Sequence, residues 1–136
     1  MQLQPYVFFY GRCQEALDFY KTALGGTYEA MRVADAPADV KEHMPPGTDK
    51  LIMHASFTAD GFSFLCSDGR EVKTIDPDAG NTSLALGATD RVEGERVFKA
   101  LSDGGKVTMP LDDAFWGGRF GMFVDRFGNE WMITST

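Results

Sequence analysis

The feature that most constrains how this chain can fold is an internal duplication. At a constant offset of 79 residues, Phe19 recurs as Phe98 and the pair Gly25-Gly26 recurs as Gly104-Gly105. Each glycine pair follows a stretch with apolar residues at helical spacing, and glycine is the usual residue just past the end of a helix. The chain is therefore predicted to contain two copies of one supersecondary unit.

Both copies begin with the same order of elements. In the first copy, the run "YVFFY" (6–10) predicts a buried strand, residues 14–24 predict an amphipathic helix, and "TYEAMRV" (27–33) predicts a second strand. In the second copy, "LALGA" (84–88) predicts a strand. Asp90 and Glu93 then form a capping-box pattern, and Val97, Ala100 and Leu101 give the helical stripe.

A hairpin ends each copy. "KLIMHASFTADGFSFLCSD" (50–68) predicts two strands joined by an Asp60-Gly61 turn. "RFGMFVDRFGNEWMITS" (119–135) predicts two strands joined by a turn at 125–128, and an offset of 67 residues carries Gly61 onto Gly128. The offset is smaller here because the first copy contains an extra proline-rich loop at 34–49. This loop is predicted to lie on the protein surface.

These patterns predict an α+β fold built from paired βαβββ modules. The modules are expected to form a curved, mostly antiparallel sheet around a concave cavity, with the helices packed outside, and a ligand would occupy the cavity. We expect one domain over residues 1–136, with module one at about 1–69, a linker at about 70–80 and module two at about 81–136.

Composition excludes several classes of partner. The formal net charge is −7 and the basic residues are scattered, so binding to nucleic acid or to an anionic membrane surface is not predicted. No apolar run approaches the roughly 20 residues that span a bilayer, and no signal peptide is evident. The sequence predicts a soluble cytoplasmic protein, in which Cys13 and Cys66 are free thiols.

The motifs that carry this pattern resemble those of a known superfamily. They are "QPYVFFYGRCQEALDFY" (4–20), "KLIMHASF" (50–57), "CSDG" (66–69), "GGKVTMPL" (104–111) and "FWGGRFGMFVDRFGNEWMI" (115–133). Over essentially its whole length the chain is similar to the vicinal oxygen chelate superfamily of glyoxalases, dioxygenases and bleomycin resistance proteins, and within it to the PhnB-like branch. Methyltransferase labels occur in that branch, but this chain has no strand-GxGxG-helix unit for such chemistry.

The resemblance also implies where a divalent metal would be bound. Catalytic members use four ligands, one from the first and one from the last strand of each module, and these positions correspond to Pro5, Leu65, Ser83 and Met132. A shift of one residue would replace Pro5 by Gln4 and Leu65 by Cys66. Neither alignment gives two strong ligands and a carboxylate. No metal and no other cofactor is therefore predicted.

His54 is the one histidine expected on a strand. Three roles remain open for it: a polar group lining the pocket, a structural hydrogen-bonding residue, or a metal ligand. It is also the candidate for a catalytic residue, although no partner carboxylate can be named from the sequence.

The aromatic C-terminal motif supplies the other candidates. Gly117 and Gly118 allow unusual backbone angles and close backbone approach. Trp116 and Arg119, beside them, could grip a planar or anionic ligand by stacking and a bidentate contact. Phe115 and Phe123 complete the predicted ligand-binding set. Structural roles are expected for three further residues of this motif. Asp125 and Arg126 are predicted to close a turn, and Trp131 is predicted to pack a helix against the sheet.

Three functions compete on this evidence. The first is a metal-free protein that binds a small organic ligand in an aromatic cavity. The second is an enzyme that keeps a metal through substituted ligands, with glyoxalase-like or dioxygenase-like chemistry, and the third is a metal-independent enzyme using His54 and Arg119. The resemblance implies a homodimer in each case, with the concave sites at or near the subunit interface, because modules of this superfamily commonly pair across a two-fold axis and open sheet edges favour pairing.

Overall fold

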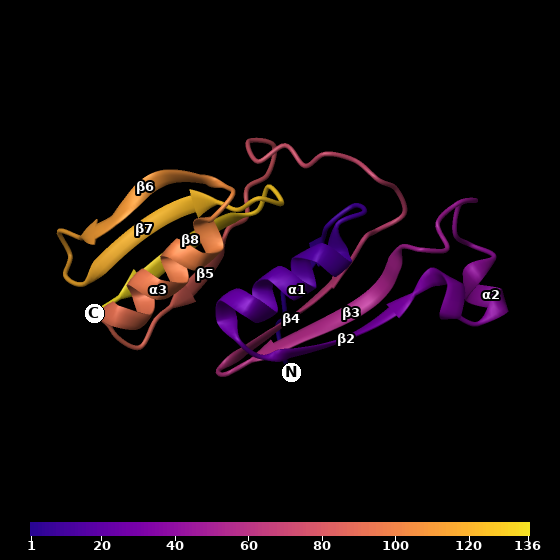
Figure 1. Ribbon diagram of the computed structural model, residues 1–136, viewed down its shortest axis with the longest axis horizontal. Helices are drawn as coiled ribbons and strands as arrows, with labels where there is room; N and C mark the ends of the chain where they lie inside the picture. The colour runs from indigo at the N-terminus through magenta and orange to yellow at the C-terminus, as the bar shows by residue number, and fades with distance from the viewer. The chain divides into compact units, whose positions relative to one another are not determined.

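The computed structural model describes residues 1–136 and shows two compact units, Met1–Thr74 and Ile75–Thr136. Each unit contains one long helix and a four-stranded sheet in the order βαβββ (Figure 1). The α+β class and the duplicated βαβββ order are thereby confirmed. The backbone hydrogen bonds form two separate sheets, one in each unit.

The first unit has its strands in the order β1-β4-β3-β2, with β1 parallel to β4 and the other pairs antiparallel. Its main elements are β1 (Tyr6–Phe8), α1 (Cys13–Leu24), β2 (Thr27–Arg32), β3 (Ile52–Ala59) and β4 (Phe62–Ser67). The predicted loop at 34–49 overlaps two short helices, η1 (Val33–Asp35) and α2 (Ala38–Lys41).

The second unit repeats this topology in the order β5-β8-β7-β6, again with one parallel pair, β5 and β8. Its elements are β5 (Leu84–Gly87), α3 (Arg91–Ser102), β6 (Lys106–Asp113), β7 (Arg119–Val124) and β8 (Glu130–Ser135). Pro110 lies in β6, which is an edge strand, where a missing backbone N–H is tolerated.

The strand registers confirm the duplication residue by residue. Tyr6 pairs with Leu65 in the first unit, and the equivalent residues Ala85 and Met132 pair in the second. Adding 79 to the position of Tyr6 gives Ala85, and adding 67 to the position of Leu65 gives Met132. The two units therefore share their register as well as their order of elements.

The two long helices end as the sequence predicts, and α3 also begins as predicted, whereas α1 begins one residue earlier than expected, at Cys13. The Asp90 side chain accepts a hydrogen bond from Glu93 N (2.8 Å) at the start of α3. The Glu93 carboxylate reaches back to Thr89, and hydrogen bonds from the Thr89 hydroxyl and N–H hold its pKa below the usual value. Past the helix ends, Gly25 and Gly104 adopt φ angles of +74° and +78°.

An aromatic core lies between α1 and its sheet in the first unit. Tyr20 on α1 is fully buried and makes edge contacts with Phe57 and Phe64, at 6.5 and 6.0 Å between ring centroids. Cys13 and Cys66 are free and buried, as predicted, with their sulfurs 3.7 Å apart. The hydrogen bond that the Cys13 thiol donates to Cys66 and its burial raise the pKa of the Cys13 thiol, so Cys13 is poorly suited to nucleophilic chemistry.

The core of the second unit is organised around Phe123 and Trp131. Their rings are stacked with centroids 6.4 Å apart, and Phe98 on α3 meets Phe123 edge-on at 5.1 Å. Trp131 is only 3% exposed, and its indole N–H donates to the Asp125 carboxylate (2.9 Å). The structural role predicted for Trp131 is confirmed.

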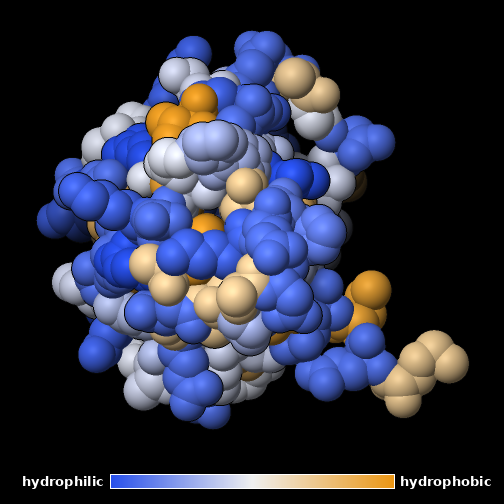
Figure 2. Space-filling model, turned by 90° about the vertical axis from the view of Figure 1, so that its right-hand side faces the viewer, coloured by the Kyte–Doolittle hydropathy of each residue, from blue (hydrophilic) through white to orange (hydrophobic).

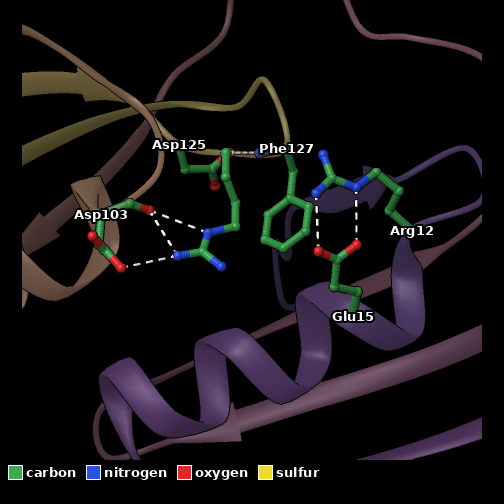
Figure 3. Close-up of polar contacts among 6 residues, drawn as sticks. Arg12, Glu15, Asp103, Asp125 and Phe127 are labelled. Atoms are coloured by element: carbon green, nitrogen blue, oxygen red, sulfur yellow. Dashed lines mark hydrogen bonds and ion pairs between the residues drawn. The ribbon is translucent and has the colours of Figure 1, made fainter.

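The turn between β7 and β8 is closed by Asp125, as predicted. Asp125 Oδ1 accepts hydrogen bonds from Phe127 N (2.9 Å) and Asn129 N (3.0 Å). Arg126 acts differently from the prediction, because its guanidinium donates to the Asp103 carbonyl and carboxylate at the end of α3 (Figure 3). The turn is therefore closed by one residue and tied to the helix by the next.

No helix in the structure is both long enough and apolar enough to cross a membrane. The face presented in Figure 2 is mostly hydrophilic, with apolar residues in small separate groups. Larger exposed apolar side chains are found in β1, in β6 and in the segment between β6 and β7.

Candidate functional site

A hollow of about 300 Å³ lies in the second unit, beside the segment that joins β6 to β7. We call it the aromatic hollow. Its lining residues are Met109, Pro110, Asp112, Asp113, Ala114, Phe115, Trp116 and Phe120. Cavities that hold small organic ligands begin at about this volume.

Three aromatic rings form one continuous wall of the aromatic hollow. The Phe115 and Trp116 rings meet edge to face at 4.7 Å between centroids, and Trp116 meets Phe120 in the same way at 5.6 Å. Phe115 is 97% exposed and Trp116 is 62% exposed. Exposed apolar surface of this kind is typical of interaction sites, which makes the aromatic hollow the candidate site.

A tight turn presents Trp116 at the mouth of the hollow. Ala114 N donates to Gly118 O (2.9 Å), and Gly117 N donates to Ala114 O (3.1 Å). Gly117 and Gly118 have φ angles of +98° and +73°, and a Cβ on Gly118 would lie 2.6 Å from the Ser135 carbonyl oxygen. The expected unusual angles are present at both glycines, and the expected close backbone approach is present at Gly118.

Gly118→Ala is therefore expected to displace the turn that carries Trp116. The added methyl group meets backbone that cannot rotate away, and the left-handed φ adds strain, so we expect a destabilisation of about 2–4 kcal/mol. Gly117→Ala is the matched control. It imposes the same kind of φ strain, but its Cβ has nothing within 4 Å, so a loss of about 1 kcal/mol is expected. Thermal unfolding of both variants measures the difference, and equal losses would contradict the steric argument.

Arg119 lies away from the aromatic wall. Its guanidinium donates to Glu95 on α3 (2.8 Å) and to the Leu111 carbonyl (3.1 Å), and its side chain is only 14% exposed. Since side chains alternate along a strand, Arg119 and Phe120 point to opposite faces of the sheet. The structure therefore pairs Trp116 with Phe120, and places Arg119 against the helix.

Phe123 shares the helix-facing side of β7 with Arg119. It is completely buried between Phe98 and Trp131. Of the ligand-binding residues predicted in this unit, Phe115 and Trp116 line the aromatic hollow, whereas Arg119 and Phe123 do not.

His54 lies in the first unit, exposed on β3. Its Nδ1 is 3.2 Å from the Tyr6 hydroxyl, and the two rings are 5.8 Å apart. Phe8 and Tyr10 continue this row of rings, with Phe8 5.0 Å from Tyr6 and stacked on Tyr10 at 5.9 Å. His54 therefore belongs to an aromatic row on the open side of the first sheet.

The residues present do not fit the superfamily's metal. At the four positions given by the resemblance, Leu65 and Met132 offer no oxygen or nitrogen ligand, and the Ser83 hydroxyl is hydrogen-bonded to Glu130. Gln4, from the shifted alignment, donates its amide to Ser63 (2.7 Å). No group of three or more His, Cys, Asp or Glu side chains lies close enough together to hold a metal ion.

Sequence reasoning missed the residues that complete the aromatic hollow. Phe120 supplies its third ring, and Met109 and Asp112 come from the irregular edge strand β6. The alternation of side chains along β7 could have identified Phe120. The contribution of β6 depends on register shifts near Met109 that no sequence pattern predicts.

Comparison with known proteins gives a consistent result. The model of the Glyoxalase/Bleomycin resistance protein/Dioxygenase superfamily matches residues 2–133. Protein YjdN of Escherichia coli (strain K12) is 31% identical, over 98% of this chain and 94% of its own length. The crystal structure of PA1353 from Pseudomonas aeruginosa is 38% identical with a TM-score of 0.84, covering 99% of this chain and 97% of its own. The PhnB protein from Bacillus cereus is 25% identical with a TM-score of 0.77, and the alignment covers both chains fully.

Proposed function

We propose that this chain, which belongs to the Glyoxalase/Bleomycin resistance protein/Dioxygenase superfamily, binds a small organic ligand in the aromatic hollow without the superfamily's metal. The observation that carries the proposal is the wall of three rings around a space of about 300 Å³. A flat apolar molecule placed there would remove Trp116 and Phe115 from water. Each aromatic side chain buried in this way contributes about 1.5–3 kcal/mol at most.

The absence of suitable metal ligands favours binding over the superfamily's metal-dependent chemistry. Divalent cations that activate substrate oxygens need imidazole, carboxylate or amide ligands, whereas two of the four corresponding positions are Leu65 and Met132. A catalytic role for His54 stays a prediction. Its hydrogen-bond partner is the Tyr6 hydroxyl, which orients the imidazole ring.

Truncation of the exposed indole tests the proposal. Three two-ring probes of similar size are 2-naphthol, 2-naphthoate and N-methylquinolinium, which are neutral, anionic and cationic at pH 7.5. We expect at least one of them to bind to the protein in ligand-observed NMR titrations, and Trp116→Ala to weaken that binding by about five- to 150-fold, as stacking contacts of about 1–3 kcal/mol imply.

Trp131→Phe is the matched control, because Trp131 is buried in the core of the same unit. This substitution should leave probe binding unchanged. Failure of all three probes to bind would refute the aromatic hollow as a ligand site. Elemental analysis of the dialysed protein tests the metal separately, beside His54→Ala. Near-stoichiometric zinc, nickel, iron or manganese that is lost in this variant would instead revive the enzyme hypothesis.

We further propose that the chain forms a homodimer. The sheets have β1, β2, β5 and β6 as edge strands, and such edges favour pairing with another chain. β1 also carries Tyr6 and Phe8, which are 41% and 44% exposed. Burying these rings would supply part of the apolar area that a stable dimer needs.

Sedimentation equilibrium is expected to give twice the 15.0 kDa mass of one chain. Phe8→Glu should reduce it to the mass of a single chain, because it places a charge among apolar side chains. The matched control is Val92→Glu on α3, which is 76% exposed and should leave the mass unchanged. A single-chain mass for the unsubstituted protein at high concentration would contradict the dimer.

A further inference from the structure

We infer that the aromatic hollow selects organic cations, meaning flat aromatic molecules that carry a positive charge. This inference rests on the proposed function and names the chemical class of the ligand. The residues that line the hollow include two carboxylates, Asp112 and Asp113, and no lysine, arginine or histidine.

The two carboxylates differ in how far their charge is compensated. Asp113 forms an ion pair with Arg91 on α3, at 3.2 Å. Asp112 forms no ion pair, and its Oδ1 accepts a hydrogen bond from Asp113 N (2.7 Å). The negative charge left over at the hollow is therefore that of Asp112.

The rings beside this charge favour the same ligand. The face of an aromatic ring carries a negative quadrupole, so a cation over Trp116 or Phe120 is attracted where an anion is repelled. Asp112 pairs with Phe120 across β6 and β7, so both side chains lie on the same face of the sheet, and the hollow combines a carboxylate that has no ion pair with aromatic faces. Aromatic faces recognise quaternary ammonium ligands, and the carboxylate adds a direct charge attraction. The net charge of −7 also attracts cations and repels anions, and it acts over longer distances than the contacts in the hollow.

Charge-matched probes and one isosteric substitution test the inference. N-methylquinolinium is expected to bind roughly tenfold more tightly than 2-naphthol, which has a similar ring area, with 2-naphthoate the weakest. Asp112→Asn should reduce the preference for the cation to about twofold, through weaker binding of N-methylquinolinium. The asparagine keeps a carbonyl oxygen for the hydrogen bond from Asp113 N, so the local backbone should be preserved.

Asp60→Asn is the matched control, because it makes the same change in net charge in the first unit. Asp60 is exposed in the β3–β4 turn, and Asn-Gly suits such a turn as well as Asp-Gly does. The control should keep the full tenfold preference. An equal loss in both variants would mean that only the overall charge matters and would overturn the inference.

The outcomes separate the inference from the proposed function. Equal binding of 2-naphthol and N-methylquinolinium, both weakened by Trp116→Ala, would overturn the preference for cations and leave the ligand site standing. Binding of no probe would overturn both. If Trp116→Ala dissociated the dimer, a second copy of the chain would be the occupant of the hollow, and the inference would be wrong.

Discussion

Replacing Asp68 by alanine is expected to lower the free energy of unfolding by about 3–6 kcal/mol. Asp68 lies directly after β4 and is 3% exposed. Its Oδ1 accepts hydrogen bonds from Gly11 N and Cys13 N, and its Oδ2 accepts one from Ile52 N, each 2.8 Å long. Alanine would leave three backbone N–H groups without this acceptor, and each costs about 1–3 kcal/mol when it is buried.

The position of Asp68 explains why one side chain has so large an effect. Arg12 at the start of α1 provides no side-chain cap, so Asp68 supplies that acceptor from another part of the chain. The same carboxylate also places negative charge at the positive end of the helix dipole. One side chain therefore joins the start of α1 to the beginning of β3 through three hydrogen bonds.

Chemical denaturation measures this loss, with Asp68→Asn as the informative second variant. Asparagine keeps one carbonyl oxygen for Gly11 N and Cys13 N but turns an amide N–H₂ toward Ile52 N, so a smaller loss of about 2–3 kcal/mol is expected. The exposed Asp60→Asn should stay within about 0.5 kcal/mol of the unsubstituted protein. A loss below about 1 kcal/mol for Asp68→Ala would show that water replaces the carboxylate and would refute this account.

The duplicated fold could be predicted because its signals are local. The apolar stripes, the glycine pairs after the helices and the two hairpin turns each depend on a few neighbouring residues. The structure extends the repetition to the strand pairing of Tyr6 with Leu65 and of Ala85 with Met132, which the sequence signals did not assign. The anchoring role of Asp68 was not predictable, because its partners are 16 to 57 positions away along the chain.

The candidate site was predicted only in part, and the side-chain alternation of β7 explains the difference. Trp116 and Phe115 were identified from the glycine turn, which is a local signal. Arg119 was grouped with them because it is close in sequence, but it begins a strand in which neighbours point to opposite faces. Glu95 on α3 then provides a partner for it on the helix side. Phe120 lies on the opposite face of β7 and provides the third ring of the aromatic wall.

A bulge in β3 similarly altered the expected surroundings of His54. Simple alternation along β3 would place Ile52 and His54 on one face of the sheet. In the structure Arg32 pairs with Ile52 and Met31 pairs with His54, so Met53 is an extra residue in the strand. Ile52 is consequently buried while His54 is exposed. Bulges of this kind depend on both strands, and a pattern read along one strand does not reveal them.

Asp125 should be the corresponding anchor of the second unit, and Asp125→Ala is expected to cost about 2–5 kcal/mol. Its carboxylate is 3% exposed and accepts from the backbone N–H groups of Phe127 and Asn129 and from the Trp131 indole. Loss of this acceptor would open the β7–β8 turn and leave a buried indole N–H unpaired. Both effects lie in the unit that carries the aromatic hollow.

A double-mutant cycle with Trp131→Phe separates these two effects. Phenylalanine removes the indole N–H, so Asp125→Ala in that background should cost about 1–2 kcal/mol less than it does alone. The loss that Asp125→Ala still causes in the Trp131→Phe background would then measure how much the turn contributes to the free energy of unfolding. Strictly additive losses would mean that the hydrogen bond between Trp131 and Asp125 contributes nothing to stability. In that case the stacking of Trp131 on Phe123 would be what holds the indole in place, and probe binding to Trp116 should survive Asp125→Ala as long as the unit stays folded.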